Sequence, residues 1–192
     1  YNITARINVN KDNVSIRGNG NATVLKRMWN STSAEGVITL ISVEGCRIEN
    51  LQIDGNKTTY TSSYNHSIYL HSSTNNIVTG NTCNNNSNGI SIYASNNNTI
   101  TGNTYNNNNS DGIYLSTSSN NIVTGNICNN NNSDGILLYV STNNIVTGNT
   151  CNNNDTYGIR LSGGRNNTIT GNTCNNNING IRLISSSNNT IT

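Results

Sequence analysis

The sequence predicts an all-β solenoid, in which short strands stack coil upon coil around a narrow core. The first observation is a repeat of 22 to 23 residues, a period typical of solenoids. The second is that each repeat holds two short runs of alternating apolar and polar residues, separated by turns rich in Asn, Ser and Gly. The third is that only 32% of the 192 residues are hydrophobic, which suits a thin core better than a conventional globule.

Two columns of glycine mark the repeat. Gly-Asn pairs recur in steps of 22, 23, 23 and 23 residues, and a second glycine opens the next apolar run in steps of 23, 23, 23 and 22. The first column is Gly80, Gly102, Gly125, Gly148 and Gly171, and the second is Gly89, Gly112, Gly135, Gly158 and Gly180. An Asn-rich, aromatic-poor composition is also typical of disordered chains, but disorder requires no fixed period.

The inward-facing positions of each coil are predicted from columns that stay apolar. In the first run these are Ile68, Ile90, Ile113, Ile136 and Ile159, followed two residues later by Leu70, Ile92, Leu115, Leu138 and Leu161. In the second run they are Val78, Ile100, Val123, Val146, Ile169 and Ile191. A third column, Cys83, Tyr105, Cys128, Cys151 and Cys174, is also expected to face inward, with the cysteines as free, buried thiols.

Asparagine is expected to fill the turns and to stack from coil to coil. Its amide both donates and accepts hydrogen bonds, and it tolerates the left-handed backbone that sharp turns require. The predicted internal ladder is Asn81, Asn103, Asn126, Asn149 and Asn172.

The pattern NNTITGNTCNNNxxGIxL resembles the right-handed parallel β-helix repeat of the pectate-lyase-like superfamily, and most of all the repeats of NosD-type periplasmic proteins and of archaeal and bacterial cell-surface proteins. The resemblance implies a right-handed, single-stranded parallel β-helix of about eight coils. We expect one continuous solenoid domain, with irregular N-terminal coils and an inserted loop in residues 1–66 and regular repeats in residues 67–192.

Charge and hydropathy disfavour two classes of function. A net charge of +2 with 9% charged residues provides no strong field for nucleic acid. No stretch approaches the roughly 18 apolar residues of a membrane span, so no membrane insertion is expected within this chain. The resemblance to surface proteins instead implies an exported, extracellular or cell-surface location.

The resemblance also raises the question of catalysis. Enzymes of this superfamily carry clustered Asp with Arg or Lys on the outer side of the first strand. Here the outward columns of that strand contain no carboxylate, and Asp111, Asp134 and Asp155 are expected to be turn residues that bond their own backbone. His66 and His71 have no Cys or acid at ligand spacing. The prediction is therefore no catalytic residues, no metal, no cofactor and no enzymatic activity.

The same outward columns predict a ligand or partner face rich in Tyr and Arg. Tyr offers a flat ring that stacks on sugars and Arg a fork that pairs with acidic groups, although both are also common at protein contacts and Tyr suits exposed strands in general. The residues are Tyr69, His71, Tyr93, Tyr114, Tyr139, Arg160 and Arg182.

The chain is rich in acceptor motifs for N-glycosylation, and four of them recur in steps of 23 residues. The candidates are Asn2, Asn13, Asn21, Asn30, Asn56, Asn65, Asn85, Asn97, Asn108, Asn131, Asn154, Asn166 and Asn188. A repeat carries a sequon along with it, so the spacing is equally compatible with unused motifs.

Both ends of the sequence lack a capping element, which predicts either a fragment of a longer protein or self-association by strand addition. The function expected from the sequence is therefore a structural surface protein that is glycosylated and assembles end to end into a filament, sheath, surface layer or adhesin stalk. Alternatives are a polysaccharide-binding module that uses the Tyr/Arg face, and a carbohydrate lyase or hydrolase.

Overall fold

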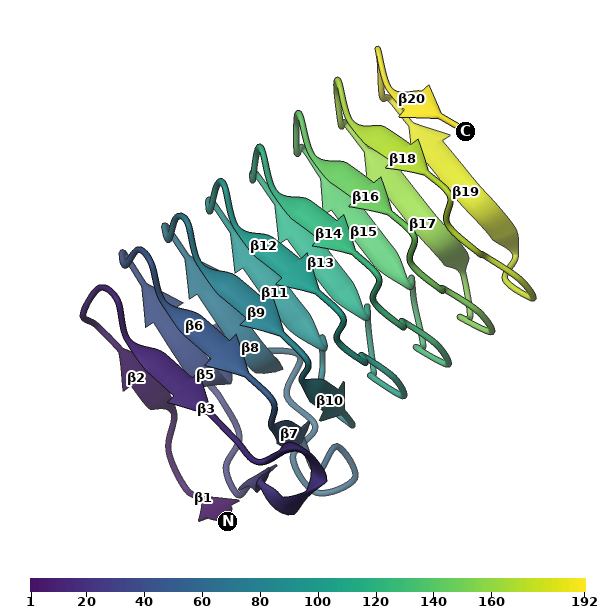
Figure 1. The fold of residues 1–192 in the computed structure, drawn as a ribbon. Coiled ribbons are helices and arrows are strands. Elements are labelled where there is room, and N and C mark those ends of the chain that lie inside the picture. Colours follow the sequence, from purple (N-terminus) through teal and green to yellow (C-terminus); the bar gives the residue numbers. More distant parts are fainter.

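The computed structural model describes residues 1–192 as a right-handed parallel β-helix with three sheets along its length (Figure 1). Sheets B and C contain eight strands each and sheet A contains four, and every strand pair is parallel. Eight strands in each long sheet agree with the predicted count of about eight coils. The only helix is a three-residue 3-10 turn, Gly20–Ala22, so no helix has the length and apolar character needed to cross a membrane.

Sheet B begins each coil and sheet C follows it. The strands of sheet B are β2 (Ile7–Val9), β5 (Glu35–Ile41), β8 (Asn65–His71), β11 (Ile90–Tyr93), β13 (Ile113–Ser116), β15 (Ile136–Tyr139), β17 (Tyr157–Ser162) and β19 (Asn179–Ile184). Those of sheet C are β3 (Ser15–Arg17), β6 (Arg47–Glu49), β9 (Ile77–Thr79), β12 (Thr99–Thr101), β14 (Ile122–Thr124), β16 (Ile145–Thr147), β18 (Thr168–Thr170) and β20 (Thr190–Ile191).

Sheet A is a third side of the coil that alternation in the sequence did not reveal. Its strands are β1 (Asn2–Ile3), β4 (Val24–Arg27), β7 (Gln52–Asp54) and β10 (Thr82–Asn84). Beyond β10 it continues only as single bridges through Thr104, Ile127, Thr150 and Thr173. One paired residue per coil is too short to show a period of two, so the prediction of two strands per coil was incomplete.

The core follows the predicted columns. In sheet B, Ile90 pairs with Ile113, and the register continues through Ile136 to Ile159. The inner faces of the three sheets form one cluster of 29 buried residues that runs along the solenoid axis. Because each coil contributes only a few of these side chains, a chain with little apolar content still has a continuous core. All five cysteines are free, and four of them are buried.

Asparagine forms three internal ladders, one at each corner of the coil. The predicted ladder through Asn81, Asn103, Asn126, Asn149 and Asn172 is confirmed, with each amide nitrogen 3.0–3.1 Å from the next amide oxygen. The other two run from Asn76 through Asn98, Asn121, Asn144 and Asn167 to Asn189, and from Asn86 through Asn108, Asn131 and Asn154 to Asn177. These amides also accept backbone N–H groups, which leaves few unpaired polar groups inside.

The ladders correct part of the glycosylation prediction. Asn108, Asn131 and Asn154 are at most 3% exposed, and Asn65 is 1% exposed, because their side chains bond inside the fold. A glycan on any of them would break those bonds, so the recurring sequons cannot form a glycan column on the folded protein. Asn85 lies outside that ladder, since Asn86 is the residue in register with Asn108. The exposed sequons are Asn2, Asn13, Asn21, Asn30, Asn97, Asn166 and Asn188.

Candidate functional site

The outer face of sheet B carries all seven residues of the predicted ligand face. One outward column is Tyr69, Ser91, Tyr114, Leu137, Arg160 and Arg182, and the next is His71, Tyr93, Ser116, Tyr139, Ser162 and Ile184. Neighbours within a column belong to adjacent parallel strands about 4.8 Å apart. A ligand that follows one column therefore runs parallel to the solenoid axis.

Three rings at the N-terminal part of this face form an aromatic row, Tyr69, His71 and Tyr93. The ring centroids of Tyr69 and His71 lie 6.0 Å apart with planes only 8° from parallel. His71 and Tyr93 stack at 5.3 Å and 21° across β8 and β11. Burial, with a smaller contribution from Tyr93, raises the pKa of Tyr69, so its hydroxyl stays a neutral hydrogen-bond donor. The row is a flat apolar platform with polar edges, the kind of surface that stacks on sugar rings.

Small residues separate this row from the next rings. Ser91 lies between Tyr69 and Tyr114 in one column, and Ser116 lies between Tyr93 and Tyr139 in the other. The serines are buried by their larger neighbours, whereas Tyr93 is 43% exposed and Tyr139 is 46% exposed. Platforms thus recur every second coil, about 9.6 Å apart.

A buried polar column flanks this face at the start of the strands. Asn88 Oδ1 accepts the backbone N–H of Asp111, and Asp111 Oδ1 in turn accepts that of Asp134. Asp134 Oδ1 accepts the N–H of Tyr157 and the hydroxyl of Thr156. These bonds reach the next coil, so the prediction that the two aspartates bond their own turns was wrong. Burial raises the pKa of Asp111 to about 6.

Asp134 also holds an arginine in place on the outer face. Its Oδ2 lies 2.7 Å from Arg160 Nε, and the Arg160 guanidinium lies 5.6 Å from the ring of Tyr157. The carboxylate is completely buried, whereas the arginine side chain is 28% exposed. Sequence analysis missed this pair because its members are 26 residues apart, one coil plus three positions.

Arg27 is a second residue that sequence analysis missed. It lies inside the first coils, where Nη2 donates to the carbonyl of His66 and Nη1 donates to Ser31 and Asn65. Its guanidinium lies 4.1 Å from the Trp29 ring, and burial lowers the pKa of Arg27 to about 10. Burial and then Arg27 lower the pKa of His66 to about 3, so His66 is neutral beneath Tyr69. Arg27 thus anchors the strand that carries the aromatic row.

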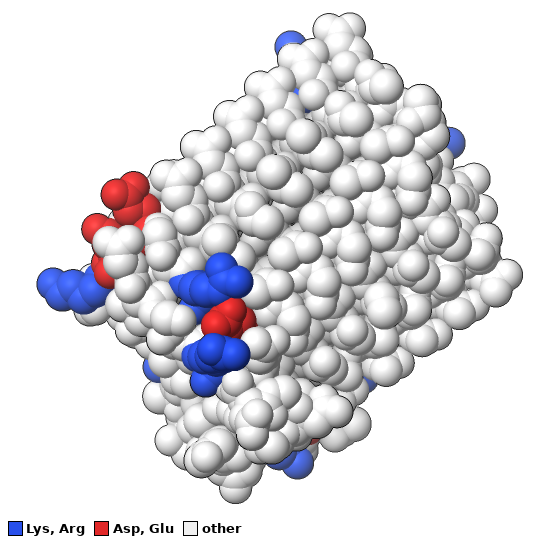
Figure 2. Space-filling model, viewed as in Figure 1, with Lys and Arg blue, Asp and Glu red and all other residues white.

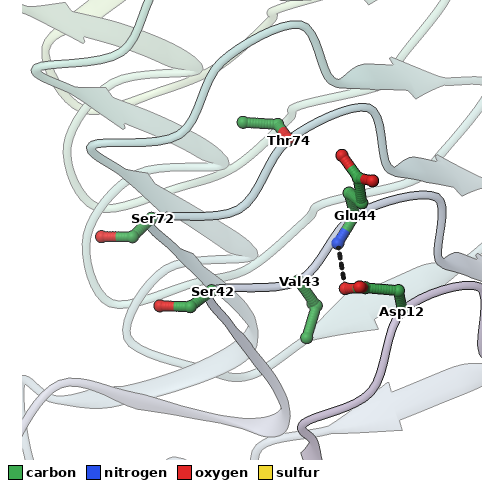
Figure 3. A pocket seen from close by; sticks show the side chains of 6 residues that line it. All are labelled: Asp12, Ser42, Val43, Glu44, Ser72 and Thr74. Atoms are coloured by element: carbon green, nitrogen blue, oxygen red, sulfur yellow. Dashed lines mark hydrogen bonds between the residues drawn. The ribbon is translucent and has the colours of Figure 1, made fainter.

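A shallow polar hollow of about 230 Å³ lies over the turns that lead from sheet B to sheet C (Figure 3). Its lining is Asp12, Ser42, Val43, Glu44, Ser72 and Thr74. Asp12 Oδ1 accepts the backbone N–H of Glu44 at 2.9 Å, so one carboxylate is already used to join two coils. The hollow borders the coils of the aromatic row but has no ring of its own.

Comparison with known proteins places this geometry in context. The family described as "Periplasmic copper-binding protein (NosD)" matches residues 2–111 and 49–192, which together span nearly the whole chain. Among curated proteins none matches.

Solved structures with the same fold are carbohydrate-active. The Azotobacter vinelandii mannuronan C-5 epimerase AlgE4 A-module has a TM-score of 0.74 at 17% identity, over 99% of this chain and 64% of that one. The Agl-KA catalytic domain has a TM-score of 0.73 at 22% identity, over 99% and 38%. A GH87 alpha-1,3-glucanase catalytic domain in complex with nigerose has a TM-score of 0.71 at 18% identity, over 90% and 32%. The chain spans less than two thirds of each.

These neighbours contradict the prediction that the chain is not an enzyme, because the solved structures that share its fold are an epimerase and glucanase catalytic domains. That prediction depended on the lack of carboxylates in the outward columns. The structure places Asp111 and Asp134 directly beside those columns, where the sequence alone did not locate them.

The copper named in the family description can be tested against the residues present. No three His, Cys, Asp or Glu side chains are arranged to hold a metal ion. Cys128 and Cys151 are completely buried inside the core, and hydrogen bonding with Cys128, together with burial, raises the pKa of Cys151 well above that of an ordinary thiol. The thiolate that copper prefers is disfavoured there. These residues do not fit a copper centre, and the account below includes no copper step.

Proposed function

This chain belongs to the NosD family of periplasmic proteins, and from that premise we propose that it recognises a polysaccharide along the outer face of sheet B, as part of an exported carbohydrate-active protein. The observation that carries the proposal is the aromatic row, in which Tyr69, His71 and Tyr93 form one stacked platform across two coils. Stacked, half-exposed rings on a rigid sheet bind with little loss of conformational entropy.

The spacing of the face supports a polymer rather than a single sugar. Tyr114 and Tyr139 follow the aromatic row along the same two columns, with buried serines between them. The resulting interval of about 9.6 Å is comparable to the length of two linked sugar rings in an extended chain. The fold neighbours named above act on or are bound to saccharides, which agrees with this class of ligand.

Binding to soluble polysaccharides tests the proposal. Tyr93→Ala is expected to weaken binding about threefold to tenfold, the value typical of one lost aromatic contact. The matched control is Ile122→Ala on sheet C, because Ile122 is 40% exposed and Tyr93 is 43% exposed. Equal affinity of the two variants for every polymer bound by the parent chain would contradict the proposal.

Chemical modification of the bound polymer is a second candidate function. It is favoured by the position of His71, a titratable ring stacked between the hydroxyl-bearing rings of Tyr69 and Tyr93 on the exposed face. Incubation with uronate polymers and with neutral glucans, followed by analysis of chain length and sugar configuration, tests it. Turnover that persists in His71→Ala would exclude this ring as the acting group.

The filament, sheath, surface layer or adhesin stalk predicted from the sequence stays a prediction, as does end-to-end self-association. Polysaccharide recognition is preferred because it has a defined surface on the molecule, whereas assembly depends on the ends of the solenoid. Electron microscopy of the purified chain distinguishes the two, since a filament protein forms end-to-end fibres without added polysaccharide.

A further inference from the structure

Two arginines stand side by side at the C-terminal end of the polysaccharide face. Arg160 of β17 and Arg182 of β19 are register partners, so their side chains leave the same face of adjacent strands about 4.8 Å apart. Like charges directly opposite each other in a sheet destabilise it unless something compensates them. The pair therefore calls for a source of negative charge.

The protein supplies only half of that compensation. Asp134 Oδ2 pairs with Nε of Arg160, and none of the other three ion pairs of the structure involves Arg182. Residues 156–192 contain three arginines and no Asp or Glu. This end of the face is thus locally basic, although the whole chain has a net charge of only +2.

Arg160 is held in a position that leaves its fork free. Asp134 binds Nε, and Asp134 is itself fixed by the backbone N–H of Tyr157 and by Thr156. The two terminal nitrogens of Arg160 donate to no protein group, and they are not among the buried atoms without a partner. A planar fork with two free N–H groups matches a carboxylate in bidentate geometry. Because its position is already fixed, little entropy is lost on binding.

The pair continues the line of the aromatic platforms. Tyr69, Tyr114, Arg160 and Arg182 all belong to one outward column, in which Leu137 precedes Arg160. A polymer stacked on the rings and running along the axis therefore reaches both guanidinium groups without leaving the column.

Building on the proposed function, we propose that Arg160 and Arg182 form a subsite for the carboxylate of an acidic sugar, so that the polysaccharide recognised by this chain is a uronate-containing one. Asp134 acts as a positioning residue that aims the Arg160 fork. The aromatic row provides affinity for the sugar rings, and the arginine pair selects the charged polymer over a neutral one.

The test compares a uronate oligomer with the same oligomer after reduction of its carboxyl groups to hydroxymethyl groups, by calorimetry on the full chain. The parent is expected to bind the uronate form at least about tenfold more tightly, the scale of one charge-assisted hydrogen-bond pair. Arg160→Gln and Arg182→Gln should each reduce this preference, and the double variant should abolish it. Raised salt should reduce the preference of the parent as well.

Arg165→Gln is the matched control, because Arg165 is an exposed arginine in a turn of the same coils but outside the outward column. It makes the same change in net charge and should keep the preference. Asp134→Asn is expected to weaken the uronate preference while binding of the reduced oligomer is kept. If loss of the buried ion pair unfolds this variant or Arg160→Gln, Arg182→Gln still tests the subsite, since Arg182 makes no ion pair within the protein.

The outcomes separate the two proposals. Equal binding of the uronate and reduced oligomers, with both weakened by Tyr93→Ala, would overturn the subsite and leave polysaccharide recognition in place. Binding of neither oligomer would contradict the proposed function itself. Binding of a sulfated neutral oligomer as tightly as the uronate would overturn the assignment to a carboxylate.

Discussion

The outer faces of sheets B and C are built on the same coils and the same register, yet they differ in chemistry. After Glu49, one outward column of sheet C contains only threonine, from Thr79 to Thr170, and the other alternates between Ile and Thr. The columns of sheet B contain Tyr, His, Arg, Ser and Leu. Figure 2 shows charge gathered on the first coils and an almost uncharged surface beyond them.

The difference shows which positions the fold constrains. Inward and turn positions repeat in both sheets, because the core and the ladders need them. Outward positions are free, and sheet C fills them with residues that suit any strand. Sheet B departs from this uniform pattern, and its departures are grouped as stacked rings and paired arginines. We take such a grouped departure as the sign of a binding face.

The two sheets also differ where their strands begin. In sheet C this position is asparagine in every regular coil, as in Asn98, Asn121 and Asn144. In sheet B the column changes from Asn88 to Asp111 and Asp134. An aspartate can accept the same N–H but cannot donate, and as an ion it loses hydration when buried.

The largest expected effect comes from a ladder that both faces share. Asn126 donates to Asn149 and to the carbonyls of Ile100 and Thr124, and its Oδ1 accepts from Asn103. Asn126→Ala leaves several of these buried groups unpaired and should lower the free energy of unfolding by about 3 kcal/mol. Denaturant titration measures it. A loss below about 1 kcal/mol would mean that water replaces the amide and that the ladder is not essential.

The aspartate of sheet B gives the next effect. The pKa of Asp111 is raised from 3.8 to about 6 in the folded protein, so its contribution to stability is present below pH 4 and is lost as pH rises through 6. Asp111→Asn should therefore stabilise the protein by about 2 kcal/mol at neutral pH, with no gain below pH 4. Asn88 already fills the same role one coil earlier.

Thermal melts from pH 3 to pH 8 check this prediction. Asp155→Asn is the control, because Asp155 is exposed and should show no such pH-dependent gain. A destabilised Asp111→Asn at neutral pH would mean that the ionised carboxylate is needed, and the column would then have to be reconsidered as a charged site.

Much of this architecture could be predicted from the sequence, because a strict period fixes which residues align in neighbouring coils. The inward columns, the ladder through Asn126 and the outward position of Tyr93 all follow from that alignment. The Asp134–Arg160 pair did not, since it crosses the period by three positions. Arg27 also escaped prediction, because burial of a charged side chain depends on partners such as Ser31 and His66 that a separate loop supplies.

A double substitution in the aromatic row tests the face more strongly than one. Tyr69→Ala with Tyr93→Ala should reduce affinity for the polysaccharide about tenfold or more, because the platform on both sides of His71 is removed. Calorimetry measures the change, and unaltered thermal melts serve as its control. Unchanged affinity would assign the ligand to another surface.

The smallest effect is expected on sheet C. Ile122→Thr and Ile145→Thr should each change the free energy of unfolding by no more than about 0.5 kcal/mol and leave binding unaltered. Thr99 and Thr168 already occupy the same column. A large loss of binding from either substitution would remove the distinction between the two faces.

Hydroxyl-radical footprinting with and without the uronate oligomer tests the central claim most directly. Tyr93 and Tyr139 on sheet B are 43% and 46% exposed, and Ile122 and Ile145 on sheet C are 40% and 43% exposed, so the two faces are matched in accessibility. The account predicts that the oligomer protects the two tyrosines and leaves the oxidation rates of the two isoleucines unchanged. Protection of the isoleucines alone, or of both faces equally, would contradict it.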